Sequence, residues 1–204
     1  MLFKDYQKPY ELLREENQIG GGVAIAAHKR VKFVRLKEYE KVGLEANFAL
    51  VKVDEVKTVV GSVYINVGKV SQFDLLDNVI KEILKDHSKL IICMDANASC
   101  SLWDKKSVID NNYTRKKMGH RLEKIVDKYG MYVHNNGEAT YHSGETSSSI
   151  DVTLSIGICE DHKTNWSILE DELRSPHSGI LMKVGNENSE KVEVIDWKRF
   201  GWES

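Results

Sequence analysis

The chain has 204 residues, which is long enough for one α/β domain with a sizeable core and too short for two full domains. Hydrophobic residues make up 41% and charged residues 29%, so the composition excludes a mostly disordered chain. The formal net charge of −2 excludes a strongly basic protein, so any contact with a nucleic acid has to come from a local cluster of cations.

The cysteines and the hydropathy indicate an intracellular protein. Cys93, Cys100 and Cys159 form no C-x-x-C pair and leave one thiol over, a pattern typical of a reducing compartment. No apolar stretch reaches the length of a membrane span, and the N-terminus lacks the apolar core of a signal peptide. We therefore expect a nuclear or cytoplasmic protein that does not bind a membrane.

A glycine-rich segment at residues 20–22 precedes the first apolar run, 23–27. Neither Gly-Lys-Ser/Thr nor a helical pattern follows, so a tight turn that leads into a strand is favoured over a nucleotide-binding loop. The partner of this strand is expected at 31–36. The runs 46–53 and 58–66 predict an antiparallel hairpin.

A short, continuous apolar run at 90–94 predicts a strand that is covered on both faces. It stops at Asp95 and Asn97, where sheets of this kind bind ligands, and oxygen ligands of these types suit a divalent cation or a phosphate. Asp and Asn also favour simple turns, and this stretch alone does not decide between the two interpretations. Tyr64, near the end of an earlier strand, either packs in the core or faces the same rim.

Two helices flank this strand in the sequence. The first begins at Ser71 with the capping pattern Ser71-x-x-Asp74, and apolar residues follow at helical spacing. The second covers 114–129 and stops at Gly130, and a strand is expected at 131–134.

Cations are concentrated just after the proposed ligand loop and in the second helix. Such a run is most simply a solvated face. Because it follows the ligand loop directly, the alternative is a surface that contacts DNA phosphates. The candidate DNA-binding residues are Lys105, Lys106, Arg115, Lys116 and Lys117.

The last strands are expected at 147–156, 166–169 and 180–184. Asp151 lies within the first of them, and an acid in an apolar strand has to be paired or hydrogen-bonded. His177 stands just before the last run. The order of elements predicts two sheets packed face to face with helices outside, in a domain over 1–186 followed by a polar linker, 187–204.

Five segments stand in an order that is typical of one known family: GGGVAIA, SVYIN, MDANASCSLW, SSSIDVTL and SPHSGI. Together they resemble the endonuclease/exonuclease/phosphatase superfamily, and within it the endonuclease domain of non-LTR retrotransposons. The resemblance covers nearly the whole chain. It implies a four-layer α/β sandwich with two mixed β-sheets, hydrolysis that depends on Mg²⁺ or Mn²⁺, nicking of double-stranded DNA, and a downstream reverse transcriptase in a parent polyprotein.

The resemblance also implies roles for individual side chains. Asp95 would orient or activate the attacking water and, with Asn97, bind the metal, while Asn97 would also hold the scissile phosphate. Tyr64 would donate to that phosphate or stabilise the leaving oxygen. His177 would act as the general base or as an imidazolium on the phosphate, and Asp151 would fix its tautomer.

Two departures from the family pattern predict weak activity. Family members carry a metal-binding Glu on a strand ahead of the glycines, whereas only 19 residues precede Gly20 and Lys8 stands in the nearest similar segment. The first strands and the main metal ligand are therefore expected to be absent. Pro176 replaces the acid that precedes the family's His. We expect an impaired endonuclease or, alternatively, an inactive remnant that serves as a DNA-binding or interaction module. A phosphatase with the same fold is a third alternative.

Overall fold

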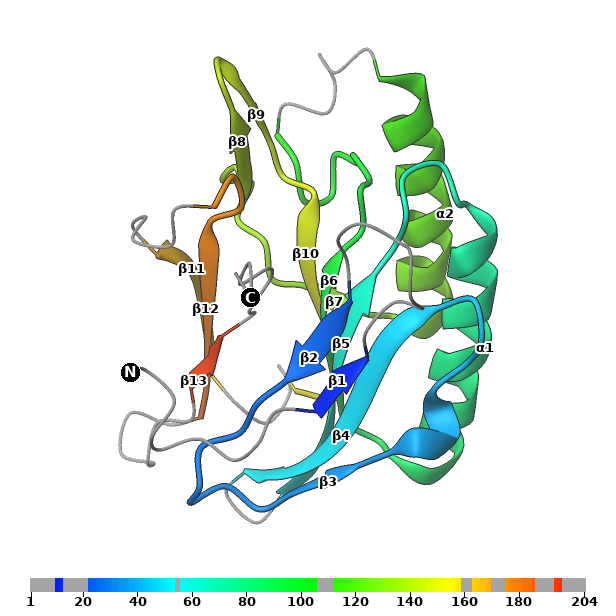
Figure 1. Ribbon diagram of the computed structural model, residues 1–204, viewed down its shortest axis with the longest axis vertical. Coiled ribbons are helices and arrows are strands. Elements are labelled where there is room, and N and C mark those ends of the chain that lie inside the picture. Colours follow the sequence, from blue (N-terminus) through cyan, green and yellow to red (C-terminus); the bar gives the residue numbers. More distant parts are fainter. Residues whose placement is uncertain are drawn as a thin grey trace, which may run out of the picture.

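The computed structural model describes residues 10–12, 22–53, 56–105, 112–158, 163–169, 175–185 and 193–195. Its main sheet has six strands in the order β3-β4-β5-β6-β10-β7 (Figure 1). The pairing is antiparallel except between β5 and β6, which run parallel. The strands are β3 (Phe33–Arg35), β4 (Glu45–Val53), β5 (Val56–Tyr64), β6 (Leu90–Asp95), β7 (Tyr132–Val133) and β10 (Asp151–Ile156).

Three smaller sheets accompany the main sheet. One has three strands in the order β11-β12-β13, and the others are the two-stranded pairs β1-β2 and β8-β9, the latter a tight hairpin. Their bounds are β1 (Tyr10–Leu12), β2 (Val23–Ile25), β8 (Tyr141–Ser143), β9 (Thr146–Ser148), β11 (Thr164–Leu169), β12 (Gly179–Val184) and β13 (Glu193–Ile195). A short 3-10 helix, η1 (Lys37–Tyr39), precedes β4.

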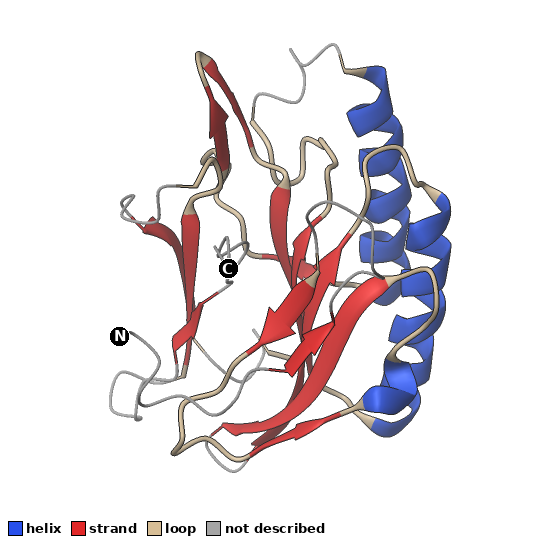
Figure 2. Cartoon of the chain, in the orientation of Figure 1, coloured by secondary structure: helices blue, strands red, loops and turns tan. Residues whose placement is uncertain are grey.

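The two helices α1 (Ser71–Asp86) and α2 (Tyr113–Tyr129) cover one face of the main sheet, and the three-stranded sheet lies on the other side (Figure 2). Side chains alternate along β6: Ile92 and Met94 pack in the core beneath the helices, whereas Ile91 and Cys93 pack with Trp166 of β11. The predicted fold class, with two packed sheets and helices outside, is therefore confirmed. In the part of the chain that the structure describes, both helices lie on the same side, and neither is long and apolar enough to span a membrane.

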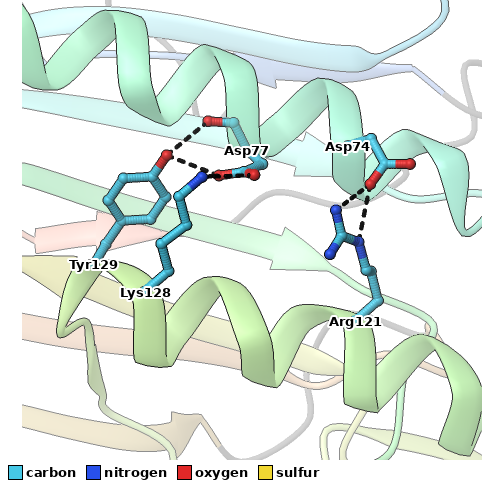
Figure 3. Close-up of polar contacts among 5 residues, drawn as sticks. All are labelled: Asp74, Asp77, Arg121, Lys128 and Tyr129. Carbon is cyan, nitrogen blue, oxygen red and sulfur yellow. Dashed lines mark hydrogen bonds and ion pairs between the residues drawn. The ribbon is translucent and has the colours of Figure 1, made fainter.

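Ion pairs fix α1 against α2 (Figure 3). Arg121 of α2 pairs with Asp74 of α1, and two turns further on Lys128 Nζ lies 2.7 Å from Asp77 Oδ1. Tyr129 donates its hydroxyl to the same Asp77 oxygen at 2.7 Å. Burial raises the pKa of Asp77, but the hydrogen bonds from Lys128 and Tyr129 outweigh it and hold this pKa below its usual value. The charge of Arg121 is thus paired with an acid of the same domain.

Three expectations about local structure are wrong. The run at 31–36 does not pair with β2; β3 pairs with β4, and β2 pairs with β1, which lies before the glycine-rich segment. Ser71 does not cap α1, because the cap residue is Val70 and no side chain bonds to the first turn. The strand β13 pairs with β12 although it lies within 187–204, where no strand was predicted. The stop of α2 at Gly130 is confirmed by its left-handed φ of 58°.

His134 follows β7 directly and is buried beside β10, the strand that pairs with β7. Its Nε2 lies 2.8 Å from Ser155 Oγ, and its backbone N–H donates to the Thr153 carbonyl. Burial lowers the pKa of His134 from 6.5 to about 4. The ring is therefore neutral in the folded protein at neutral pH.

This shift predicts an acid-sensitive contribution to stability. Between pH 6.5 and 4 the unfolded chain protonates His134 and the folded chain does not, so stability falls as the pH drops through this window. Between pH 7 and 5, we expect the free energy of unfolding of the His134→Gln variant, whose amide can still bond to Ser155, to fall by about 2 kcal/mol less than that of the parent. Urea unfolding at the two pH values measures the difference. Equal losses in the two proteins would contradict the buried neutral ring.

Candidate active site

Four polar residues lie side by side across the main sheet at the carboxyl end of β6. Asp95, the last residue of β6, is directly opposite Asp151 on one side and Tyr64 on the other. Glu45, the first residue of β4, is opposite Tyr64. Residues paired in this way point to the same face of a sheet. Because odd-numbered residues of β6 face the three-stranded sheet, this row of side chains faces it as well.

His177 reaches this row from the segment just before β12. It forms an isolated bridge with Tyr141 of the β8-β9 hairpin, and the two rings pack edge to face with centroids 4.8 Å apart. His177 Nδ1 lies 2.9 Å from Asp151 Oδ2, which is the hydrogen bond that the sequence predicted. An ionised carboxylate only accepts, so Nδ1 carries the proton and Nε2 is the acceptor of the neutral ring.

Asp95, Asp151 and His177 form a group with the donor atoms of a metal site. One ligand atom from each lies within 4.8 Å of the others, and both carboxylates are buried. Carboxylates suit Mg²⁺ and Mn²⁺, whereas imidazole suits softer metals. Mg²⁺ is typically bound by only one or two carboxylates plus waters and phosphate. The pair Asp95 and Asp151 therefore fits a hard cation while His177 keeps its hydrogen bond to Asp151.

Asn97 ties the loop after β6 to the neighbouring strand. Its Nδ2 donates to the Ile65 carbonyl at 2.9 Å, and its backbone N–H donates to Asp95 Oδ1 at 3.1 Å. Its φ of 45° is in the left-handed region, which Asn tolerates better than most residues. The structure thus shows Asn97 orienting Asp95, and its predicted contact with metal or phosphate stays a prediction.

Most of this loop is buried and held by α2, and of its described residues, 96–105, only Ser101, Leu102 and Lys105 are exposed. Ser99 Oγ donates to Asp104 at 3.1 Å, and Ser99 N donates to the carbonyl of Arg115 in the first turns of α2. Gly119, on the same face of α2, lies so close that an added Cβ would overlap the Ser99 carbonyl oxygen. The position of Asp95 therefore depends on the packing of α2 against the loop.

The candidate DNA-binding cations differ in their surroundings from the other cations of α2. Lys105 and Lys117 are exposed and Arg115 and Lys116 half-buried, and in the described part of the chain none of these four has an acidic partner. Arg121 and Lys128, further along α2, are paired with acids of α1 (Figure 3). Lys106 lies outside the described residues. Arg115, Lys116 and Lys117 lie in the first turns of α2, whereas the side chain of Lys105 lies close to Gly137, between β7 and β8.

Two residues near the site were not predicted. Tyr141 packs on the His177 ring, but a tyrosine in a short polar hairpin carries no signal in the sequence. Glu45 accepts hydrogen bonds from Gly22 N at 3.1 Å and Asn66 Nδ2 at 3.0 Å. Glu45 begins the strand that pairs with the strand ending at Tyr64, so the sequence did contain a signal for it. That signal can be used only when the register of the β4-β5 hairpin is known.

A sequence model described as endonuclease-reverse transcriptase matches residues 58–181, which is more than half of the chain and includes every site residue from Tyr64 to His177. The chain belongs to this family. The resemblance that the motifs indicated is thereby confirmed. The endonuclease-reverse transcriptase match ends within β12 and so contains the whole Asp95, Asp151 and His177 group. No curated protein sequence matches the chain.

Solved structures share the fold at low identity. The endonuclease domain of TRAS1, a telomere-specific non-LTR retrotransposon, is 16% identical, with a TM-score of 0.71 over 91% of this chain and 82% of that domain. The 3′ phosphatase NExo from Neisseria, bound to a product DNA hairpin, is 16% identical, with a TM-score of 0.59 over 81% of this chain and 75% of the phosphatase. A mannosyl-6-phosphatase from Bacteroides thetaiotaomicron is 13% identical, with a TM-score of 0.60 over 90% and 78%. At these identities the likeness concerns the fold alone.

Proposed function

We propose that this chain is the metal-dependent endonuclease domain of a non-LTR retrotransposon, which hydrolyses one phosphodiester bond of double-stranded DNA. The observation that carries the proposal is the convergence of Asp95, Asp151 and His177 in a member of the endonuclease-reverse transcriptase family. The fold of the TRAS1 endonuclease domain supports it. In this proposal the chain works inside the cell, in the nucleus or cytoplasm, beside a reverse transcriptase domain of the same polyprotein.

The geometry of the site supports the following chemistry. Asp95 and Asp151 would hold Mg²⁺ or Mn²⁺, which would stabilise the negative charge that develops on the phosphate. His177 uses Nε2 to accept a proton from the attacking water or to contact the phosphate, because Nδ1–H is held by Asp151. Tyr64, next to Asp95 in the sheet, donates to the phosphate or to the leaving oxygen.

We further propose that the rate is low, because Pro176 stands where the family motif carries an acid beside the His. The Pro176 carbonyl accepts a hydrogen bond from His142 N at 2.7 Å, so this residue serves the contact between β8 and the segment before β12. Its ring supplies no oxygen for a metal or a water. The same observation favours the second candidate, a DNA-binding module that keeps the fold without the reaction.

Nicking of supercoiled plasmid separates these two candidates. The purified chain should convert it slowly to the open circle with Mg²⁺ or Mn²⁺ and stop with chelator. The Pro176→Asp variant keeps the backbone carbonyl and adds a carboxylate, so it should be faster. Absence of nicking by both proteins with either metal, together with retained DNA binding, would select the binding module.

A second prediction concerns the unpaired cations Lys116 and Lys117 in the first turns of α2 and Lys105 in the loop that follows Asp95. Changing Lys105, Lys116 and Lys117 to Ala should weaken duplex binding and lower the slope of log K against log salt by roughly 0.9 for each phosphate that the variant no longer neutralises. The control variant changes Lys81, Lys85 and Lys124 to Ala. These substitutions remove the same charge from exposed positions elsewhere on α1 and α2. Titration of a labelled duplex at several salt concentrations measures both. An equal effect of the two triple variants would show that only net charge matters.

A further inference from the structure

Two large side chains are exposed where the loop after β5 meets α2. Tyr113, the first residue of α2, is 79% exposed, and Val67 is 64% exposed. The chain segments that carry them are in contact: Gly68 N donates to Met118 Sδ at 3.2 Å, and a Cβ on Gly68 would lie 3.7 Å from the Thr114 methyl group. The protein thus presents an aromatic ring and a branched side chain to solvent on two adjoining segments.

The segments that carry Val67 and Tyr113 are connected to the candidate active site by backbone hydrogen bonds. Val67 follows Tyr64 by three residues, and between them Ile65 N donates to the Asp95 carbonyl at 2.9 Å. Tyr113 precedes Arg115 by two residues, and the Arg115 carbonyl accepts from Ser99 N at 3.1 Å. One exposed side chain therefore stands on a segment bonded to Asp95 at the end of β6, and the other on a segment bonded to the loop that follows. In Figure 1 the loop before α1 passes beside the first turns of α2.

The charges around these side chains indicate what would cover them. Lys69, Lys116 and Lys117 flank Val67 and Tyr113 in the sequence, and in the part of the chain that the structure describes none of them has an acidic partner. The first turn of α2 contains no acid. An exposed aromatic ring with unpaired cations close to it in the sequence suits a nucleic acid, whose bases stack on the ring while its phosphates attract the cations.

We propose that Tyr113, supported by Val67, is a stacking platform for an unpaired base of the DNA strand next to the scissile phosphate. The inference rests on the proposed endonuclease function and deepens it by naming the substrate class. In a duplex the bases stack on one another and leave no face for Tyr113, so the platform requires a nucleotide that is not paired. The preferred substrate is then a duplex with a gap or a short melted segment beside the cleavage position.

Binding without cleavage tests the platform. Affinity for a labelled fully paired duplex and for the same duplex with a four-nucleotide bubble would be measured in chelator, with 2-aminopurine in the bubble to report stacking. The parent should bind the bubble more tightly than the duplex. Tyr113→Ala should lose roughly tenfold in affinity for the bubble and restore the 2-aminopurine fluorescence, with duplex affinity unchanged, because the base no longer stacks on an aromatic ring. Tyr113→Phe should behave like the parent.

The control is Tyr132→Ala, which removes another exposed tyrosine, 54% exposed, from the edge strand β7. If Tyr113→Ala and Tyr132→Ala have the same effect on the bubble, or if Tyr113→Ala weakens duplex and bubble equally, the platform is wrong although the DNA-binding function stands. If the folded parent binds neither DNA, the proposed function fails as well.

Discussion

Replacing His177 by alanine should lower the nicking rate about 10²- to 10⁴-fold, which is the usual contribution of a positioned acid–base group. The ring is fixed from two sides, by Asp151 at 2.9 Å and by the edge of Tyr141, so its Nε2 is pre-oriented. Initial rates of plasmid nicking with Mn²⁺ or Mg²⁺ measure the loss. The control is His142→Ala, because His142 is exposed and contributes its backbone to the Pro176 contact.

The hydrogen bond between His177 and Asp151 leads to a further prediction that the same assay tests. If Asp151 acts through the ring as well as through the metal, Asp151→Asn should lower the nicking rate at least as much as His177→Ala does. The activation free energy of the double variant should then rise by less than the sum of the two single increases. A His177→Ala rate equal to that of the parent would remove His177 from the mechanism. Strict additivity of the two substitutions would show that the hydrogen bond between them has no part in the reaction.

The Gly119→Ala variant should be destabilised by about 1–3 kcal/mol, the usual cost of overpacking. In an exposed helix the same substitution would stabilise by about 1 kcal/mol, because alanine is the better helix former. Here the new methyl group would overlap the Ser99 carbonyl. That carbonyl cannot retreat easily, because Ser99 is bonded through its N–H to Arg115 and through its hydroxyl to Asp104.

Chemical denaturation of Gly119→Ala measures the loss, and Lys124→Ala, an exposed position on the same helix, is the control. Because the displaced loop directly follows Asp95, the nicking rate should fall further than the fraction of unfolded protein explains. A Gly119→Ala protein that is as stable and as active as the parent would show that the loop moves freely, and would contradict the fixed placement of Asp95.

The central strand and the paired side chains were predictable from the sequence because their signals are local. The unbroken apolar run at 90–94 predicts burial on both faces, whereas the choice between a turn and a ligand site at Asp95 needed the family motifs as well. Asp151 within an apolar strand required a partner, and the family motifs named His177 as that partner. Each of these inferences depends on a few neighbouring residues.

The remaining features depend on contacts between distant segments and so left no local signal. The pairing of β1 with β2 joins segments on either side of the glycines, and β13 completes a sheet from a stretch that is polar in composition. In the sequence, Gly119 is only a residue of low helix propensity within a helix. In the structure, its small size permits the approach of the Ser99 carbonyl. The bond from Asn97 to Ile65 likewise requires the register of β5 against β6.

A comparison of two isosteric variants in the plasmid-nicking assay tests the proposed active site most directly. Asp95 and Asp104 are both buried and belong to the same loop region, but Asp95 belongs to the group with Asp151 and His177, whereas Asp104 bonds to Ser99. Asp95→Asn should abolish metal-dependent nicking by the folded protein, while Asp104→Asn should retain most of it. Equal nicking by the parent and Asp95→Asn, or a loss confined to Asp104→Asn, would contradict the proposal that this carboxylate group performs phosphodiester hydrolysis.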